Sequence, residues 1–346
     1  MMTTNTKRRL PAEWEYEACV LLSWPHANSD WAYMLDRVRE CYKNIAEALL
    51  SRGVNLIIAA PDTTDAREAL KGVDVSKIVW VDVATNDTWT RDFGPICVED
   101  NGKWKVLDFK FNGWGLKFAA NYDNLVTRNL CERKVISGEY ENHLGFVLEG
   151  GSIESDGNGT ILTTAECLLS PNRNGEMSRE EIECRLKEYL GATTLLWLEN
   201  GALEGDDTDS HVDTLARLAP NETIVYVGCQ DESDTHYEEL LRLKEELQSL
   251  RTPLGLPYHL AELPMADAVY DDEGHRLPAT YANFLVTPQA VFMPTYGNAM
   301  KDMTAAGILG AVFEKEVVSI DCRALIEQHG SLHCATMQIP RELLCI

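Results

Sequence analysis

The sequence predicts an α/β fold in which buried strands alternate with amphipathic helices. Short β-rich runs and helical patterns follow one another through most of the 346 residues. No Pro/Ser-rich linker divides the chain, and side chains of catalytic type recur at intervals of about 60 residues. Units of that length, each bringing one functional side chain to a common centre, suit a closed, radially arranged fold. We therefore expect one α/β domain over residues 1–346.

Six apolar runs have the length and the β-branched content of buried strands. They lie at 55–60, 77–83, 145–148, 194–198, 223–227 and 317–320.

Three segments between these runs have helical spacing. Residues 31–51 carry apolar side chains at i, i+3 and i+4 positions and stop at Gly53. Residues 178–190 open with Ser178 and Glu181, the pattern of a capping box. Residues 234–250 form a third amphipathic pattern, whose charges we interpret as a solvated face.

Composition limits the partners and the location of the protein. A net charge of −24 argues against nucleic acid and anionic membranes, and it favours solubility or attraction of small cations. The ten cysteines include no Cys-x-x-Cys pair, which favours reduced thiols. No apolar signal core or membrane-length run is present. We expect a cytoplasmic protein, and a homo-oligomer is compatible with the sequence.

Cys334 is the candidate nucleophile, although it is one thiol among ten. A cysteine attacks as its thiolate, so it needs a histidine or a bound cation to favour ionisation. If residues 333 and 334 form a strand, the side chain of His333 points away from that of Cys334. We therefore expect a distant histidine, His211, to be the partner.

His211 lies in an acidic segment, 205–213, that contains four aspartates. One interpretation is a metal site using His211, Asp213 and Asp207, although no metal-binding motif completes it. A second is recognition of a cation by Asp213 with proton transfer by His211, whose pKa the surrounding acids would raise. A solvated acidic loop is the third.

Two further positions combine carboxylates with an aromatic ring or with glycine. Trp89 and Asp92 place an indole face near a carboxylate, a pair that suits a planar cation. Glu149 follows an apolar strand and precedes Gly150 and Gly151, so its buried carboxylate needs a charged partner. We expect that partner to be His211 as imidazolium or a substrate cation.

Together these residues suit a guanidinium substrate. A guanidinium is planar, permanently cationic and offers five donors to carboxylates. Its charge would also promote the thiolate of Cys334. An amide or ester substrate would instead call for an oxyanion hole.

The sequence resembles the agmatine deiminases of the bacterial peptidylarginine-deiminase type, within the guanidino-group-modifying (pentein) superfamily. Seven motifs carry the resemblance in register between about residues 10 and 340: 10–15, 23–25, 86–95, 109–115, 148–153, 205–213 and 332–334. It implies the pentein fold, a β/α-propeller of five ββαβ units around a pseudo-fivefold axis.

The resemblance also implies roles. Cys334 would attack the guanidinium carbon and form a covalent thiouronium, and His211 would be the acid and base. Asp92 and Asp213 would bind the guanidinium, Glu149 would support it together with His211, and Trp89 would wall the pocket. The reaction implied is hydrolysis of agmatine to N-carbamoylputrescine and ammonia, without metal or organic cofactor.

The chain departs from the family pattern at Gly115–Phe118 and at Gln328–Ser331, where further glycines or a tyrosine are common. These departures concern the tail of the substrate more than its guanidinium head. Peptidylarginine or free arginine therefore remains an alternative substrate. A metal-dependent hydrolase and a non-catalytic pentein that only binds are alternatives of other classes.

Overall fold

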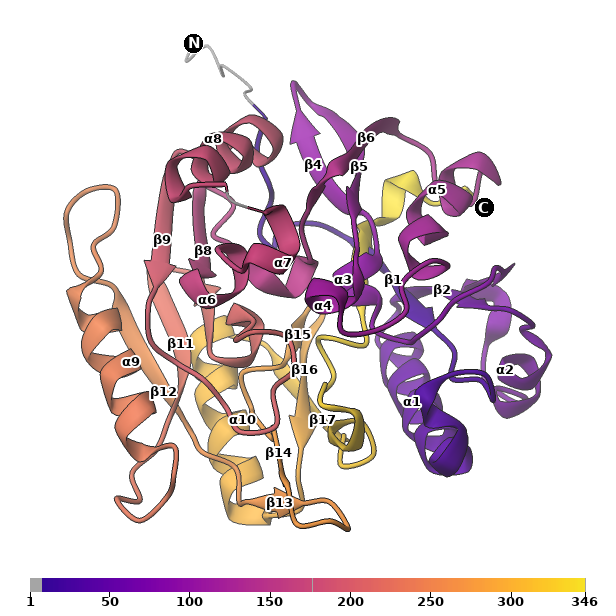
Figure 1. Ribbon diagram of the computed structural model, residues 1–346. Coiled ribbons are helices and arrows are strands. Elements are labelled where there is room, and N and C mark those ends of the chain that lie inside the picture. Colours follow the sequence, from indigo (N-terminus) through magenta and orange to yellow (C-terminus); the bar gives the residue numbers. More distant parts are fainter. Residues whose placement is uncertain (1–7, 176, 346) are drawn as a thin grey trace.

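The computed structural model describes residues 8–175 and 177–345 (Figure 1). Within these residues the strands form five sheets of three or four strands and one two-stranded ribbon. The sheets are β18 (Met337–Pro340), β1 (Ala18–Ser23), β2 (Asn55–Ala60) and β3 (Ile78–Asp82); β4 (Ile96–Asp100), β5 (Lys103–Lys110) and β6 (Glu139–Val147); β7 (Ile153–Ser155), β8 (Thr160–Thr164) and β9 (Thr194–Leu198); β10 (Ala216–Ala219), β11 (Thr223–Gly228) and β12 (His259–Pro264); β15 (Leu285–Val286), β16 (Ala290–Thr295) and β17 (Glu316–Asp321); and the ribbon β13 (Val269–Tyr270) with β14 (Arg276–Leu277).

Helices connect these strands. The α-helices are α1 (Leu35–Ser51), α2 (Thr64–Ala69), α3 (Thr90–Phe93), α4 (Gly113–Leu116), α5 (Val126–Glu132), α6 (Ala165–Leu168), α7 (Pro171–Asn174), α8 (Arg179–Leu190), α9 (Tyr237–Ser249) and α10 (Ala299–Phe313). The 3₁₀ helices are η1 (Asp30–Met34), η2 (Val75–Lys77), η3 (Asp123–Leu125), η4 (Gly150–Ser152), η5 (Val212–Thr214), η6 (Ile326–Gln328) and η7 (Arg341–Leu343). In Figure 1 the short helices α3, α4 and α7 lie near the centre of the view, whereas α1, α8 and α9 lie toward its edges.

The five larger sheets share one pairing pattern. In each, a middle strand pairs antiparallel on one side and parallel on the other, as β5 does with β4 and β6. The same holds for the middle strands β1, β8, β11 and β16. A parallel pair needs a long crossover, and the chain makes each crossover through a helix: α1, α5, α8, α9 and α10, respectively, for β1–β2, β5–β6, β8–β9, β11–β12 and β16–β17.

The predicted elements are confirmed with shifted boundaries. All six apolar runs are strands (β2, β3, β6, β9, β11 and β17), and the three helical patterns are η1 with α1, α8, and α9. The run at 145–148 covers only the end of β6, because that strand begins with the polar residues Glu139–His143, which lie outside the core. The capping box at α8 is present in both directions, and Gly191 ends the helix in the left-handed conformation.

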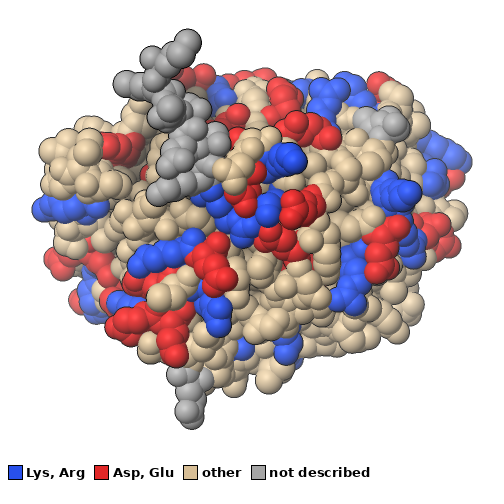
Figure 2. All heavy atoms as spheres, turned by 90° about the horizontal axis from the view of Figure 1, so that it is seen from above, with Lys and Arg blue, Asp and Glu red and all other residues tan. Residues whose placement is uncertain are grey.

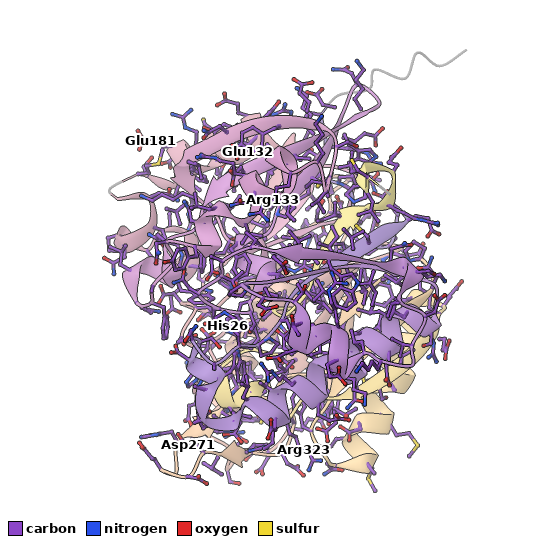
Figure 3. All side chains as sticks on the ribbon, turned by 90° about the vertical axis from the view of Figure 1, so that its right-hand side faces the viewer. His26, Glu132, Arg133, Glu181, Asp271 and Arg323 are labelled. Carbon is purple, nitrogen blue, oxygen red and sulfur yellow. The ribbon has the colours of Figure 1, made fainter. Side chains whose placement is uncertain are left out.

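The main hydrophobic core includes the site residues Trp89 and Cys334. Strands β1 and β2 are buried along their whole length, as expected for parallel strands covered on both faces, and side chains fill the space between the ribbons (Figure 3). On the face in Figure 2, acidic and basic side chains are interspersed. All ten cysteines are free thiols. Among the described residues, no helix is long and apolar enough to cross a membrane.

Candidate active site

A narrow cavity brings three of the predicted site residues together. Trp89, Asp92 and Cys334 line it, with Trp114 and Phe118. Glu149, His211 and Asp213 are fully buried behind this lining. Two contacts of 3.6 Å connect the layers: His211 Nδ1 to Asp92 Oδ1, and Cys334 Sγ to Asp213 Oδ2.

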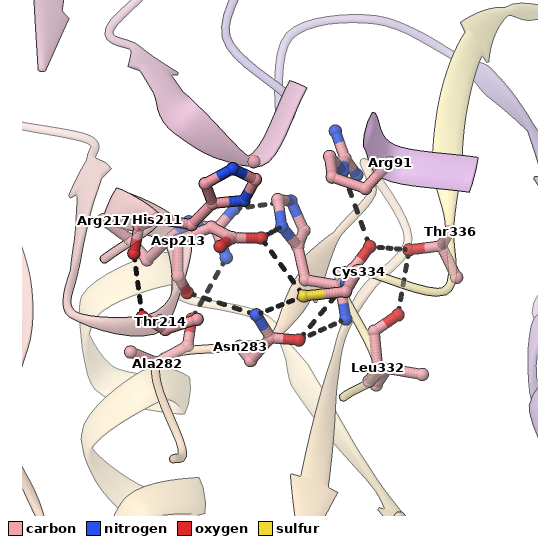
Figure 4. A network of polar contacts seen from close by, with 12 residues as sticks. Arg91, His211, Asp213, Thr214, Arg217, Ala282, Asn283, Leu332, Cys334 and Thr336 are labelled. Atoms are coloured by element: carbon pink, nitrogen blue, oxygen red, sulfur yellow. Dashed lines mark hydrogen bonds and ion pairs between the residues drawn. The ribbon is translucent and has the colours of Figure 1, made fainter. Parts of the chain in front are cut away.

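Cys334 is held by a tight turn and by one amide side chain (Figure 4). Asn283 Oδ1 accepts hydrogen bonds from the backbone N–H groups of His333 and Cys334, at 2.9 and 3.2 Å. Its Nδ2 lies 3.2 Å from Cys334 Sγ, where it would donate to a thiolate. Arg91 N donates to Cys334 O at 3.1 Å, which ties the turn to α3.

The expectation that His333 and Cys334 form a strand is wrong. Both lie in a turn before β18, because Ala335 N and Thr336 N close hydrogen bonds back to Ser331 O and His333 O. The His333 ring does not face the thiol, however. Its Nδ1 lies 2.7 Å from Asp213 Oδ2, so Asp213 stands between the two side chains.

Helix α3 positions Asp92 at the inner end of the cavity. Trp114 Nε1 donates to Asp92 Oδ2 at 2.9 Å, and Gly151 N donates to Oδ1 at 3.0 Å. A larger residue would clash at position 151, because its Cβ would lie 2.6 Å from His211 Nδ1. Trp114 reaches Asp92 because Gly113 to Leu116 turn in the left-handed region, with φ of 53° at Trp114.

His211 precedes η5 and is buried with both ring nitrogens unpartnered. The expectation that the neighbouring acids raise its pKa is wrong. Burial lowers the pKa of His211 to about 3, because desolvation of the imidazolium outweighs attraction by Asp213. The free site therefore holds a neutral imidazole, which is a proton acceptor.

Glu149 has a different partner from the one expected. Arg173 Nε lies 3.0 and 2.9 Å from the two carboxylate oxygens of Glu149. Arg173 also donates to Asp209 Oδ2 at 2.5 Å. A guanidinium from α7 thus neutralises Glu149 before any substrate arrives, although burial still raises the pKa of Glu149.

The pocket itself lacks such compensation. Burial raises the pKa of Asp92 well above its ordinary value, and the charges of Asp213 and Glu149 add to the effect. Burial and the carboxylates Asp213 and Asp92 likewise raise the pKa of the Cys334 thiol. Asp213 Oδ1 has no hydrogen-bond partner. A cation bound between Asp92 and Asp213 would lower the pKa of Asp92 and that of the Cys334 thiol. It would also give Asp213 Oδ1 a hydrogen-bond donor.

Three more carboxylates line the cavity: Asp30, Asp87 and Asp207. Burial raises the pKa of Asp87 to about 7, and the charges of Asp30 and Asp207 contribute. Burial also raises the pKa of Asp207 to about 6, opposed by His329. His329 stands at the same rim, where its Nδ1 lies 2.7 Å from Gly205 O.

Sequence reasoning missed Asn283, Arg173 and Trp114. Asn283 and Arg173 follow no motif, so only the fold could place them. Trp114 lies inside the quoted motif 109–115, and its indole beside two glycines was an available signal.

In the part of the chain that the structure describes, His211, Asp213 and Asp207 do not form a group whose ligand atoms lie close enough together to hold one metal ion. Among the described residues, the groups whose possible ligand atoms lie within 4.8 Å of one another are Glu149–Cys167–His211 and Glu13–Glu154–His333. In the first, Arg173 already binds both oxygens of Glu149.

Comparison with known proteins gives one consistent answer. The sequence profile of the Porphyromonas-type peptidyl-arginine deiminases matches residues 9–340. The agmatine deiminase of Stutzerimonas stutzeri is 32% identical, over 97% of this chain and 98% of the relative. A C. jejuni agmatine deiminase solved with substrate bound is 37% identical, covers 96% of both chains and has a TM-score of 0.90. A structure from Porphyromonas gingivalis, described as a candidate arginine deiminase, is 47% identical, with a TM-score of 0.93 and coverage of 98% and 100%. The mixed α/β fold is therefore that of agmatine deiminase structures.

Proposed function

The chain belongs to the Porphyromonas-type peptidyl-arginine deiminase family, and we propose that it hydrolyses agmatine to N-carbamoylputrescine and ammonia in polyamine metabolism. It is a hydrolase of guanidino groups. The observation that carries the proposal is the buried carboxylate of Asp92, whose ionisation burial opposes, together with the unpartnered Oδ1 of Asp213 beside the Cys334 thiol. Such a pair lacks one planar cation, and a guanidinium supplies it.

In the proposed reaction, Asp92 and Asp213 bind the guanidinium nitrogens while Trp89 walls the cavity. The substrate charge then favours ionisation of Cys334, and the neutral imidazole of His211 accepts the thiol proton. The thiolate adds to the guanidinium carbon. His211 returns the proton to the departing nitrogen, so that ammonia leaves and a covalent thiouronium remains.

The second half of the reaction uses the same groups. His211 accepts a proton from water, which adds to the thiouronium carbon, and the C–S bond breaks to release the ureido product and regenerate the Cys334 thiol. Asn283 Nδ2, 3.2 Å from the sulfur, stabilises the thiolate each time it forms. Glu149 acts with Arg173 to keep the wall beside His211 electrically neutral.

The acidic rim favours agmatine over arginine. Agmatine ends in an ammonium, which Asp30, Asp87 and Asp207 would attract. Free arginine has the same ammonium but carries an α-carboxylate on the same carbon, and these aspartates would repel that carboxylate. The second candidate, deimination of free or peptidyl arginine, draws support from the names of the family and of the P. gingivalis relative.

We also propose that the chain is a single catalytic domain with five ββαβ units around a pseudo-fivefold axis. The support is the repeated pattern of an antiparallel pair, a helix and a parallel pair in the five larger sheets. Residues 1–7, 176 and 346 lie outside the described residues.

The test is ammonia release measured side by side on agmatine, arginine and a blocked peptidyl arginine. We expect the highest kcat/KM with agmatine. We also expect Asp87→Asn to reduce the preference for agmatine over arginine about tenfold, the effect of one lost ionic hydrogen bond. The matched control is Asp272→Asn, which removes an exposed aspartate elsewhere. A higher kcat/KM on arginine than on agmatine would overturn the substrate assignment and leave the chemistry intact.

A further inference from the structure

The motif at 10–15 has no part in the reaction described above, yet one of its side chains reaches the catalytic network. Glu13 Oε1 lies 2.7 Å from His333 Nε2. The opposite ring nitrogen, Nδ1, lies 2.7 Å from Asp213 Oδ2, and that oxygen is 3.6 Å from Cys334 Sγ. Glu13, His333 and Asp213 therefore form a continuous chain from the N-terminal segment to the nucleophile.

The hydrogen bonds made by His333 determine how many protons the Glu13–His333–Asp213 chain carries. A neutral imidazole has one N–H and can donate to one carboxylate only. Both ring nitrogens of His333 lie 2.7 Å from carboxylate oxygens, and Nε2 also lies 3.0 Å from Arg217 Nη2. Each contact of 2.7 Å between a ring nitrogen and a carboxylate oxygen needs a proton on one of the two atoms. The Glu13–His333–Asp213 chain therefore carries two protons, one more than a neutral ring supplies.

The surrounding charges balance that arrangement. Two guanidiniums flank the chain: Arg91 Nη1 is 3.3 Å from Glu13 Oε1, and Arg217 Nη2 is 3.3 Å from Glu13 Oε2. Arg217 also pairs with Glu154. Together with the second proton of the Glu13–His333–Asp213 chain, these two guanidiniums balance the charges of the carboxylates of Glu13, Asp213 and Glu154.

Opposing influences act on the pKa of His333. Burial and the charges of Arg217 and Arg91 lower the pKa of His333, whereas Glu13 and Asp213 act to raise it. Burial raises the pKa of Asp213, but the hydrogen bond and charge of His333 bring it below its ordinary value. Removing Glu13 therefore removes one of the two groups that keep the proton on His333.

We propose that Glu13 and His333 are positioning residues for Asp213. They hold Oδ2 in place, leave Oδ1 free for the substrate, and keep Asp213 ionised beside the thiol. The inference rests on the proposed function, because it takes Asp213 as a carboxylate that binds the guanidinium. Glu13 acts at a distance from the substrate, through the ring.

A second cavity lies at the Glu13 end of the hydrogen-bonded chain. Glu13, Arg91 and Glu154 line it, and the Glu13 side chain is 19% exposed. Glu13 can therefore exchange protons with water, whereas Asp213, at the other end of the hydrogen-bonded chain, is fully buried.

The test is calorimetric binding of agmatine, and of guanidinium ion as a second probe, to protein carrying Cys334→Ala. Adding Glu13→Gln should weaken binding of both probes about tenfold, because a hydrogen bond to a charged group is lost. It should also increase the number of protons released on binding, counted from buffers of different ionisation enthalpy, because Asp213 is then partly protonated before it binds.

A merely structural role would change the melting temperature and leave the proton count unaltered. Glu15→Gln is the matched control in the same motif, where the carboxylate pairs with Arg9 at the surface. It should change neither value. Glu13→Asp retains the charge and should recover most of the affinity. Unchanged affinity and proton release in a folded Glu13→Gln protein would overturn the proposal.

A double-mutant cycle with His333→Asn shows whether Glu13 acts through the ring. His333→Asn keeps an N–H donor for Asp213 and removes the second proton. It should weaken binding to the same extent as Glu13→Gln, and the double variant should be no weaker. Additive effects would overturn the proposal, as would wild-type affinity in His333→Asn if Glu13→Gln does not fold. Binding of guanidinium without agmatine would contradict only the proposed substrate.

Discussion

Two charged regions of this molecule use carboxylates in opposite ways. On the sheet of β4, β5 and β6, Glu141 accepts hydrogen bonds from Arg8 at 2.6 Å and from Lys105 at 2.7 Å. Partial burial opposes ionisation there, but these two partners lower the pKa of Glu141 to about 2. In the pocket, burial and like charges raise the pKa of Asp92 well above its ordinary value.

The difference lies in whether the counter-charge belongs to the protein. The Glu141 network contains its own cations, and the folded state is where those charges are satisfied. The pocket has Asp92 and Asp213 close to a thiol and leaves Asp213 Oδ1 and both nitrogens of His211 without partners. A site of this kind is unfavourable when empty and becomes neutral with a bound guanidinium. The first region serves stability and the second serves binding.

The largest expected effect is at the nucleophile. Cys334→Ala should abolish ammonia release from agmatine, because no other group in the pocket can form the covalent intermediate. The protein should remain folded and should still bind agmatine at neutral pH, since the neutral thiol adds no charge to the free site. Activity is measured by ammonia release, and folding by circular dichroism. Substantial residual turnover would show that the thiol is not the nucleophile.

Asp92→Asn and Asp213→Asn should each lower kcat/KM at least about a hundredfold, because a guanidinium donor loses its charged acceptor. The two variants should also differ in their stability toward urea. The raised pKa of Asp92 means that folding disfavours its ionised form, so stability falls as the pH rises above the unfolded pKa of about 3.9. Asp92→Asn should therefore unfold at the same or a higher urea concentration than wild type at pH 7.

Asp213→Asn should behave differently, since the pKa of Asp213 is lowered by His333. Its loss should reduce stability at pH 7 as well as activity. Equal stability changes in the two variants would contradict the assignment of Asp92 as the uncompensated member of the pair. Near-wild-type kcat/KM in either variant would place the guanidinium site elsewhere.

The sequence predicted the pocket better than it predicted the electrostatics. Strands β2, β9 and β11 followed from apolar runs, and Trp89, Asp92 and Cys334 do line one cavity. The partner of Glu149 could not be predicted, because Arg173 belongs to a short helix whose contacts arise only in the fold. The pKa of His211 was predicted with the wrong sign, since charge spacing is visible in a sequence and depth of burial is not.

The smallest expected effect is at Glu141, in the charged network on the sheet of β4, β5 and β6. Glu141→Gln should leave kcat/KM unchanged and lower the free energy of unfolding at pH 7 by about 1 kcal/mol, the usual upper value for an exposed ion pair. Because the pKa of Glu141 is lowered in the folded state, its contribution is present above the unfolded pKa of about 4.3 and is lost as pH falls toward 2. The difference between variant and wild type in urea unfolding should therefore shrink between pH 7 and pH 3. A difference that stays constant with pH would mean that Glu141 stabilises the sheet through packing, and the contrast with the pocket would then not be one of charge.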